Sequence, residues 1–313
     1  MRAVKAVLVA AGNLKLQFPD DVEDTLILRS ITDVNEPKFL SHDIPLFNVI
    51  ISDLFPDIEL PKAEYKVRII VALLCCKDDN LEPTEYFFKK IIQSYEMMKV
   101  RHGFMLVGEP FSGKTKVLHI LAETLTRMKE NHGQEEKVIF RTLNPKAVTM
   151  GQLFGQFDMV SHEWTDGVVA NTFREFASSH TTDCKWVVFD GPMDTLWIES
   201  MNTVLDDNKK LCLMSGKIIQ MSSQMSMIFG TMDLSQASPT IVSRCGMIFM
   251  EPSELGWKPL VRSSMNTLPK ILQSVEHRDL LMELFNWLLP PSLNMLRKNC
   301  MVCTAHFSHS SLN

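Results

Sequence analysis

Short apolar runs alternate with amphipathic stretches through the middle of this 313-residue sequence. Helical periodicity covers 113–128 and recurs near 168–177. Runs with the length and composition of buried strands lie at 103–107, 138–143, 186–190, 226–229 and 246–250. Strands that alternate with helices are typical of a parallel sheet with helices on both faces. The pattern therefore predicts an α/β fold, an αβα sandwich around a five-stranded parallel sheet.

Helical patterns predominate on either side of this central region. Residues 81–100 carry apolar and aromatic positions at helical spacing, and this helix leads into the first strand. Several X-Pro turn signals between 30 and 60 predict short helices joined by loops. Beyond Glu251 the pattern predicts a smaller helical segment, which we expect Pro290 and Pro291 to end.

The apolar segments are too short to cross a membrane. The longest, 69–76, falls well below the roughly 20 residues that a spanning helix needs. Residues 1–11 superficially resemble a signal peptide, but Lys5 interrupts the apolar stretch and no clear cleavage site follows. We interpret them as an amphipathic helix and expect a soluble or peripheral chain with no membrane partner.

Composition excludes several other classes of function. The apolar fraction is 45% and the charged fraction 22%, as in globular proteins, and the net charge of −5 argues against a general nucleic-acid binder. The 7 cysteines lie mostly in apolar settings, which is typical of free thiols in a reducing compartment such as the cytoplasm. The spacing of Cys300, Cys303, His306 and His309 is tighter than in known zinc sites. We interpret this segment as an irregular tail.

One motif carries the strongest chemical signal. Residues Gly108-Glu109-Pro110-Phe111-Ser112-Gly113-Lys114-Thr115 fit the pattern G-x-x-x-x-G-K-[ST] at every constrained position, between a predicted strand and a predicted helix. The two glycines allow backbone N–H groups to turn toward phosphates. We expect the lysine to reach the β- and γ-phosphates and the threonine hydroxyl to ligate Mg²⁺. The motif predicts ATP or ADP binding; the alternative is an ordinary turn before a helix.

The carboxylate that completes such a site is predicted at Asp190. It ends an apolar strand, where an aspartate commonly holds the magnesium ion through water. The next position is Gly191, where many ATPases have a glutamate that polarises the attacking water. Glycine has no side chain for this, so we expect a site that binds nucleotide and hydrolyses it poorly. Asp194 is the alternative base.

Two further residues follow predicted strands. Asp233 lies where a polar side chain can sense a terminal phosphate, but a repelling carboxylate is unusual there, and a turn former is an equal interpretation. Arg244 ends a short segment after Pro239. From the residues alone it is either a solvated surface charge or a group offered to a neighbour's nucleotide.

Longer sequence blocks resemble the heavy chain of axonemal dynein, specifically the second of its six ring-forming AAA+ modules. The resemblance covers nearly everything from residue 1 to about 300. The blocks that carry it are 39–47, 95–103, 108–115, 143–148, 164–167, 189–192, 197–208 and 238–244. It implies a P-loop AAA+ core followed by a helical lid. The implied boundaries are 1–28 for the end of the preceding module's lid, 29–100 for a connecting region, 101–250 for the core, and 251–313 for a truncated lid and divergent tail.

The resemblance also implies a function. It implies ATP or ADP bound with Mg²⁺ at the interface with the next module, with little or no hydrolysis, in agreement with Gly191. Arg244 matches the family's arginine finger, which serves the preceding module, and Arg2 matches that module's sensor arginine. The implied partners are neighbouring AAA+ modules and, indirectly, other dynein chains. The implied location is the cytoplasm and the cytoskeleton of the ciliary axoneme.

Departures from the family pattern leave alternatives open. Gly230 and Lys217 stand where acidic residues are expected. Thr240 and Ile241 differ from the Ala-Thr that usually precedes the arginine finger in this family. No linker or microtubule-binding stalk is recognised, so we expect neither a motor nor an efficient ATPase from this chain alone. An active ATPase that uses Asp194 is a second hypothesis. A small-molecule kinase is a third, although no acceptor pocket is identified for it.

Overall fold

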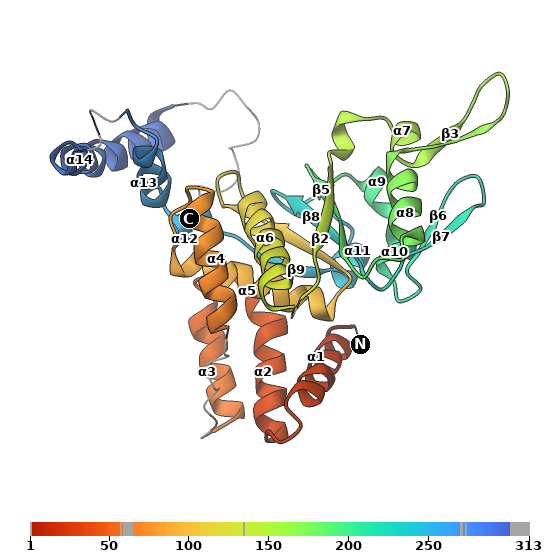
Figure 1. Ribbon diagram of the computed structural model, residues 1–313, viewed down its shortest axis with the longest axis horizontal. Coiled ribbons are helices and arrows are strands. Elements are labelled where there is room, and N and C mark those ends of the chain that lie inside the picture. The colour runs from red at the N-terminus through yellow and green to blue at the C-terminus, as the bar shows by residue number, and fades with distance from the viewer. Residues whose placement is uncertain are drawn as a thin grey trace. The chain divides into compact units, whose positions relative to one another are not determined.

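The computed structural model describes residues 2–56, 58, 65–133, 135–269, 272 and 274–300 (Figure 1). The chain divides into two units. The first comprises the residues up to Asp79 together with Pro83–Gly256, and the second comprises Asn80–Glu82 together with the residues from Trp257 on. Everything that positions the nucleotide motif lies in the first unit.

The first unit begins with helices, as its sequence predicts. They are α1 (Arg2–Gln17), α2 (Glu23–Asn35), the 3₁₀ turn η1 (Glu36–Lys38), α3 (Ile44–Leu54), α4 (Lys66–Asp78) and α5 (Glu85–Val100). Thr84 starts α5 by accepting a hydrogen bond from the Phe87 backbone N–H at 3.2 Å. None of the helices in the described ranges is both long enough and apolar enough to cross a membrane.

Strands and helices then alternate. The strands are β1 (Gly103–Val107), β2 (Val138–Leu143), β3 (Gly155–Phe157), β4 (Trp164–Asp166), β5 (Cys184–Asp190), β6 (Lys210–Cys212), β7 (Ile218–Gln220), β8 (Met225–Thr231) and β9 (Gly246–Phe249). The helices between and after them are α6 (Lys114–His132), η2 (Pro145–Ala147), α7 (Met150–Phe154), α8 (Val168–Ser178), α9 (Thr195–Glu199), α10 (Asn202–Leu205), α11 (Pro239–Arg244) and α12 (Pro252–Leu255).

The central sheet confirms the predicted α/β fold. It has five strands in the order β2-β5-β8-β1-β9, and every neighbouring pair is parallel. Each residue of β1 and β8 is buried, because both are inner strands of a parallel sheet that helices cover on both faces. The carboxyl ends of β1, β5 and β8 therefore meet at one edge of the sheet.

Helices cover both faces of the sheet, as Figure 1 shows for α6 and α8. One face packs against α8 to α11 and includes the buried aromatic residues Phe173, Phe189, Trp197 and Phe229. The other face lies under α5 and α6, and Val117 of α6 is fully buried there. This αβα sandwich holds the loop between β1 and α6 at the carboxyl edge of the strands.

The second unit is helical, with one correction to the sequence prediction. It contains α13 (Lys258–Asn266) and α14 (Val275–Asn299). The expected helix end at Pro290 and Pro291 is wrong, because α14 continues through both. Proline removes a backbone donor but fixes φ near the helical value, so the helical backbone conformation itself can continue through it.

Two antiparallel hairpins were not predicted. They are β3–β4 and β6–β7, whose strands have only three residues each. Strands this short carry too little alternation to be recognised from sequence. Cys303, His306 and His309, in the segment that we interpret as an irregular tail, lie outside the described residues.

Lys90 is an unexpected buried cation in α5. Its side chain is 6% exposed, and Nζ donates to Gln93 Oε1 at 3.0 Å. Burial, and next the charge of Lys89, lowers the pKa of Lys90 to about 8, and nearby glutamates oppose this shift. The unfolded chain binds this proton more tightly, so burial of Lys90 carries no charge penalty above pH 10.5. The penalty grows as the pH falls from 10.5 to 8 and is complete below that.

We expect Lys90→Met to stabilise the chain at pH 7 by about 2–3 kcal/mol, because it removes the cost of a buried ammonium. The gain should shrink as the pH rises toward 10. Urea unfolding of both proteins across this range measures it. Lys89→Met is the control, since Lys89 is 46% exposed and pairs with Glu36. A gain that does not change with pH would contradict this account of Lys90.

Candidate nucleotide-binding site

The loop between β1 and α6 is held by close backbone packing. The Gly108 N–H donates to the Thr231 carbonyl of β8 at 3.1 Å. A Cβ at Gly108 would lie 2.1 Å from the Met250 carbonyl oxygen, so only glycine fits here. Gly113 has φ +88°, in the left-handed region, and immediately precedes α6. The two motif glycines are therefore explained by a close approach and by a positive φ.

Lys114 lies over the loop. Its Nζ donates to the Gly108 carbonyl, to the Glu109 carbonyl at 2.9 Å and to Ser112 Oγ at 3.4 Å. Burial lowers the pKa of Lys114, and the Asp190 and Glu109 carboxylates oppose this shift. The ammonium is thus held where it can exchange loop carbonyls for phosphate oxygens.

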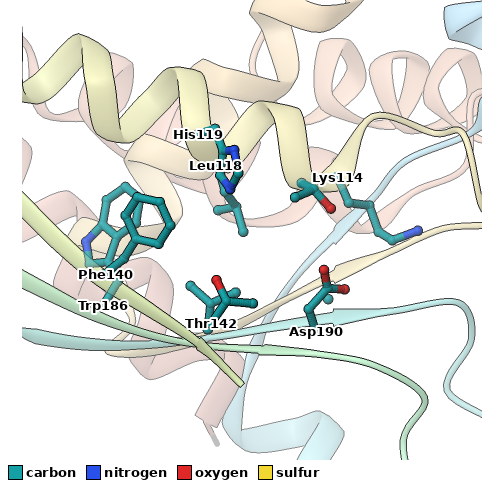
Figure 2. A pocket seen from close by; sticks show the side chains of 10 residues that line it. Lys114, Leu118, His119, Phe140, Thr142, Trp186 and Asp190 are labelled. Carbon is teal, nitrogen blue, oxygen red and sulfur yellow. The ribbon is translucent and has the colours of Figure 1, made fainter. Parts of the chain in front are cut away.

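Asp190 lies where the sequence predicts, at the end of β5. With Lys114, Thr115 and Gly230 it lines a pocket of about 380 Å³, a volume that includes space open to solvent. Figure 2 shows Lys114 on α6 and Asp190 on β5 at the same end of this pocket. The structure therefore brings the predicted lysine, threonine and aspartate together.

The rest of the pocket is mostly apolar. It runs between α6 and the strands β2 and β5. Its remaining lining residues are Leu118, His119, Phe140, Thr142, Trp186 and Val188. The sequence analysis identified none of these six, because they lie on different elements and match no motif.

Gly230 is the β8 neighbour of Asp190 in the parallel ladder. A Cβ at Gly230 would lie 3.2 Å from Asp190 Oδ1, closer than most contacts of real Cβ atoms. An acidic residue, which the sequence comparison expected here, would therefore crowd and repel the Asp190 carboxylate. Glycine leaves that carboxylate room.

A side chain at position 191 would point toward Asn144 and Pro145, which lie close to Gly191. A Cβ at Gly191 would lie 3.0 Å from Asn144 Oδ1 and 3.6 Å from Pro145 Cδ. Asn144 is fixed there because Oδ1 accepts a hydrogen bond from the Lys146 N–H at 3.0 Å. An uncharged carboxamide thus lies beside the place of the missing glutamate, and it is not a general base.

Asp194 is engaged elsewhere. It caps α9, where Oδ1 accepts a hydrogen bond from the Leu196 N–H at 3.1 Å, and Oδ2 pairs with Lys146 Nζ. The Lys146 hydrogen bond, followed by the Leu196 N–H, holds the pKa of Asp194 below its usual range. It is absent from the pocket lining. These contacts disfavour its use as a catalytic base.

Asp233 has the geometry of a turn former. Its Oδ1 accepts hydrogen bonds from the Ser235 N–H at 2.9 Å and the Ser235 hydroxyl at 2.5 Å. The Ser235 hydroxyl is the main cause of its lowered pKa, and the Ser235 N–H adds to it. Of the two interpretations of Asp233, these contacts favour the local turn.

Arg244 is not a solvated surface charge. It ends α11, and its Nε donates to Asp206 Oδ1 at 2.6 Å. Its side chain is only 13% exposed. Arg2 begins α1, and its side chain lies outside the described part of the chain.

Phe111 is a site feature that the motif does not reveal. It has φ +66°, which is rare for a bulky residue, and its side chain is 77% exposed. The motif leaves this position unconstrained, so no sequence signal marks it.

These features define a P-loop domain of the AAA class: a strand, a G-x-x-x-x-G-K-T loop, a helix and an acidic strand end in a five-stranded parallel sheet. A family model described as "AAA domain (dynein-related subfamily)" matches residues 103–245. A second, described as "Hydrolytic ATP binding site of dynein motor region", matches residues 1–115.

The most similar relatives include axonemal dynein heavy chains. Dynein axonemal heavy chain 12 of Rattus norvegicus is 71% identical over 307 residues, which cover 98% of this chain and 10% of the relative. Dynein axonemal heavy chain 3 of Mus musculus is 58% identical over 301 residues, covering 96% and 7%. This chain thus spans about a tenth of the length of these relatives, or less. It belongs to the axonemal dynein heavy chain family and corresponds to an AAA-containing segment of it.

Proposed function

We propose that this chain binds ATP or ADP with Mg²⁺ at residues 108–115 and retains the nucleotide with little or no hydrolysis. One observation carries the proposal: Lys114, Thr115 and Asp190 line one pocket. The lysine contributes charge to the β- and γ-phosphates, and backbone N–H groups of the loop and of the α6 N-terminus contribute donors.

Mg²⁺ fits the donors that are present. It prefers a hydroxyl, carboxylate oxygens and water, which Thr115 and Asp190 supply or hold. Gly230 leaves the Asp190 carboxylate its space. When bound, the ion would be held by Thr115 and, through water, by Asp190, and it would neutralise part of the phosphate charge.

Poor hydrolysis follows from what surrounds Gly191. The Asn144 carboxamide lies beside it, and Asp194 is held by Lys146 and by the first turn of α9. Neither group is placed to take a proton from an attacking water, which leaves binding without efficient turnover.

The place of the chain in a larger assembly is part of this proposal. We assign residues 101–250 to the core of the second AAA+ module of an axonemal dynein heavy chain, and 251–313 to the start of its lid and a divergent tail. Residues 1–28 would belong to the preceding module's lid, with Arg2 as that module's sensor, and 29–100 would connect the two. Arg244 would serve as an arginine finger to the preceding module. The relatives' names support an axonemal location, in cilia, where the parent motor moves on microtubules.

Phosphate release with Mg-ATP tests the proposed lack of hydrolysis. We expect wild type and Asp194→Ala to differ by less than about twofold, both far below the roughly 1–1000 s⁻¹ of typical enzymes. Asp233→Ala is a matched control, since Asp233 is also held in a local turn. Rapid release by wild type that Asp194→Ala abolishes would establish the alternative, an ATPase that uses Asp194.

A further inference from the structure

The Arg244 guanidinium is held by three residues. Nε donates to Asp206 Oδ1 at 2.6 Å and Nη2 donates to Asp206 Oδ2 at 3.2 Å, so Asp206 binds it in a bidentate manner. Nη1 donates to Asn202 Oδ1 at 3.0 Å and to the Thr240 carbonyl at 3.4 Å. These contacts use four of the five guanidinium N–H groups: the one on Nε, the two on Nη1 and one of the two on Nη2.

The edge that binds Asp206 is the edge that a phosphate needs. A guanidinium recognises carboxylates and phosphates through the same pair of parallel N–H groups. Only one N–H of Arg244 lies outside the described hydrogen bonds, so its bidentate edge is already used. Arg244 in this conformation is unable to grip a phosphate with two parallel bonds.

The backbone of Arg244 is fixed independently of its side chain. Arg101 Nη1 donates to the Arg244 carbonyl at 3.3 Å. Ile241 of the same helix is fully buried. The side chain is therefore free to change partner without release of α11 from the core.

Asp206 follows a well-anchored helix. Val204 and Leu205 of α10 are buried, so Asn202 and Asp206 are held at the two ends of a fixed turn. The adjacent Asp207 pairs with Lys5 of α1 at 2.6 Å, but both side chains are more than half exposed, and such pairs contribute little. Asp207 thus offers a matched control for Asp206.

We propose that Asp206 is a positioning residue that keeps Arg244 in a resting conformation, and that Arg244 exchanges this carboxylate for a nucleotide phosphate on the preceding module. The inference rests on the proposed role of Arg244 as an arginine finger. A terminal phosphate with more negative charge than one carboxylate competes for the same edge. The exchange makes the availability of Arg244 depend on the neighbour's nucleotide.

Chemical labelling measures whether Asp206 restrains Arg244. In a heavy-chain motor that carries this segment, we expect Asp206→Asn to raise the rate of phenylglyoxal modification at Arg244 about tenfold, because a bidentate charged pair is lost. Asp207→Asn should leave the rate unchanged. Asn202→Ala, which removes one acceptor, should give a smaller increase and serves if Asp206→Asn does not fold. An unchanged labelling rate in both Asp206→Asn and Asn202→Ala would overturn the proposal.

The ATPase rate of the same motor distinguishes the finger role of Arg244 from the proposed exchange of Asp206 for phosphate. We expect Arg244→Ala to lower it at least about tenfold, and Asp206→Asn to raise it about threefold. If Arg244→Ala has no effect, the finger role fails, and the exchange fails with it. If Arg244→Ala lowers the rate and Asp206→Asn lowers it equally, Asp206 holds Arg244 in its working conformation. That result would refute the exchange and leave the finger role intact.

Discussion

Lys114→Ala is expected to weaken Mg-ATP and Mg-ADP binding at least about 100-fold, because it removes charged hydrogen bonds to phosphate worth roughly 3 kcal/mol together. Without nucleotide the unfolding free energy should change little. The ammonium is costly to bury, as its lowered pKa indicates, and its partners are loop oxygens. Equilibrium titration with a fluorescent ATP analogue measures the affinity, and urea unfolding measures the stability.

Lys116→Ala is the matched control for this prediction. Lys116 is on the same helix, is 48% exposed and pairs with Asp79 at 3.1 Å, outside the pocket lining. It should bind nucleotide as wild type does. If both variants bind equally well, Lys114 has no direct role, and the site assignment is wrong.

Phe189→Ala is expected to lower the unfolding free energy by about 3–5 kcal/mol. Phe189 is 1% exposed in β5 and stacks on Phe229 and Trp197, with ring centroids 5.2 and 5.5 Å away. The truncation opens a cavity in the core that holds the end of β5. Since domains have only about 5–15 kcal/mol of stability, the loss is large. It should also weaken nucleotide binding, because Asp190 is the next residue.

Phe157→Ala provides the contrast. Phe157 is 51% exposed in β3 and makes an edge-to-face contact with Trp164 at 5.0 Å. Its loss should cost about 1 kcal/mol or less. Urea unfolding of the two variants tests the difference. Equal costs would mean that the Phe189 aromatic cluster does not form the core of this unit.

Features that local sequence determines were predictable. All five strands of the central sheet were expected. The three inner strands β1, β5 and β8 are almost wholly buried and largely apolar, whereas the edge strand β2 is mostly exposed and was expected from the alternation of strands and helices. The loop at 108–115 and Asp190 were recognisable because their spacing follows from phosphate chemistry. The helix over 81–100 was also expected, but it begins at Glu85, because the local signal of the Thr84 cap was not recognised.

Features that depend on distant contacts were not predictable. Asp206 and Arg244 are 38 residues apart, and only the fold brings them together. Gly108 has no room for a side chain because the Met250 carbonyl lies close to it, and Met250 is distant in the sequence. Lys90 is buried although lysine is among the most exposed residue types. The helix was wrongly expected to end at Pro290 and Pro291, because proline was treated as a helix breaker without regard to the helix around it.

The most direct test of the central claim is to equilibrate the wild-type chain with Mg-ATP, separate it from free nucleotide, and identify what remains bound. The loop geometry and the surroundings of Gly191 predict about one nucleotide per chain, held mainly as unhydrolysed ATP. A chain that retains neither ATP nor ADP, or that converts added ATP to ADP at an ordinary enzymatic rate, would contradict the proposal.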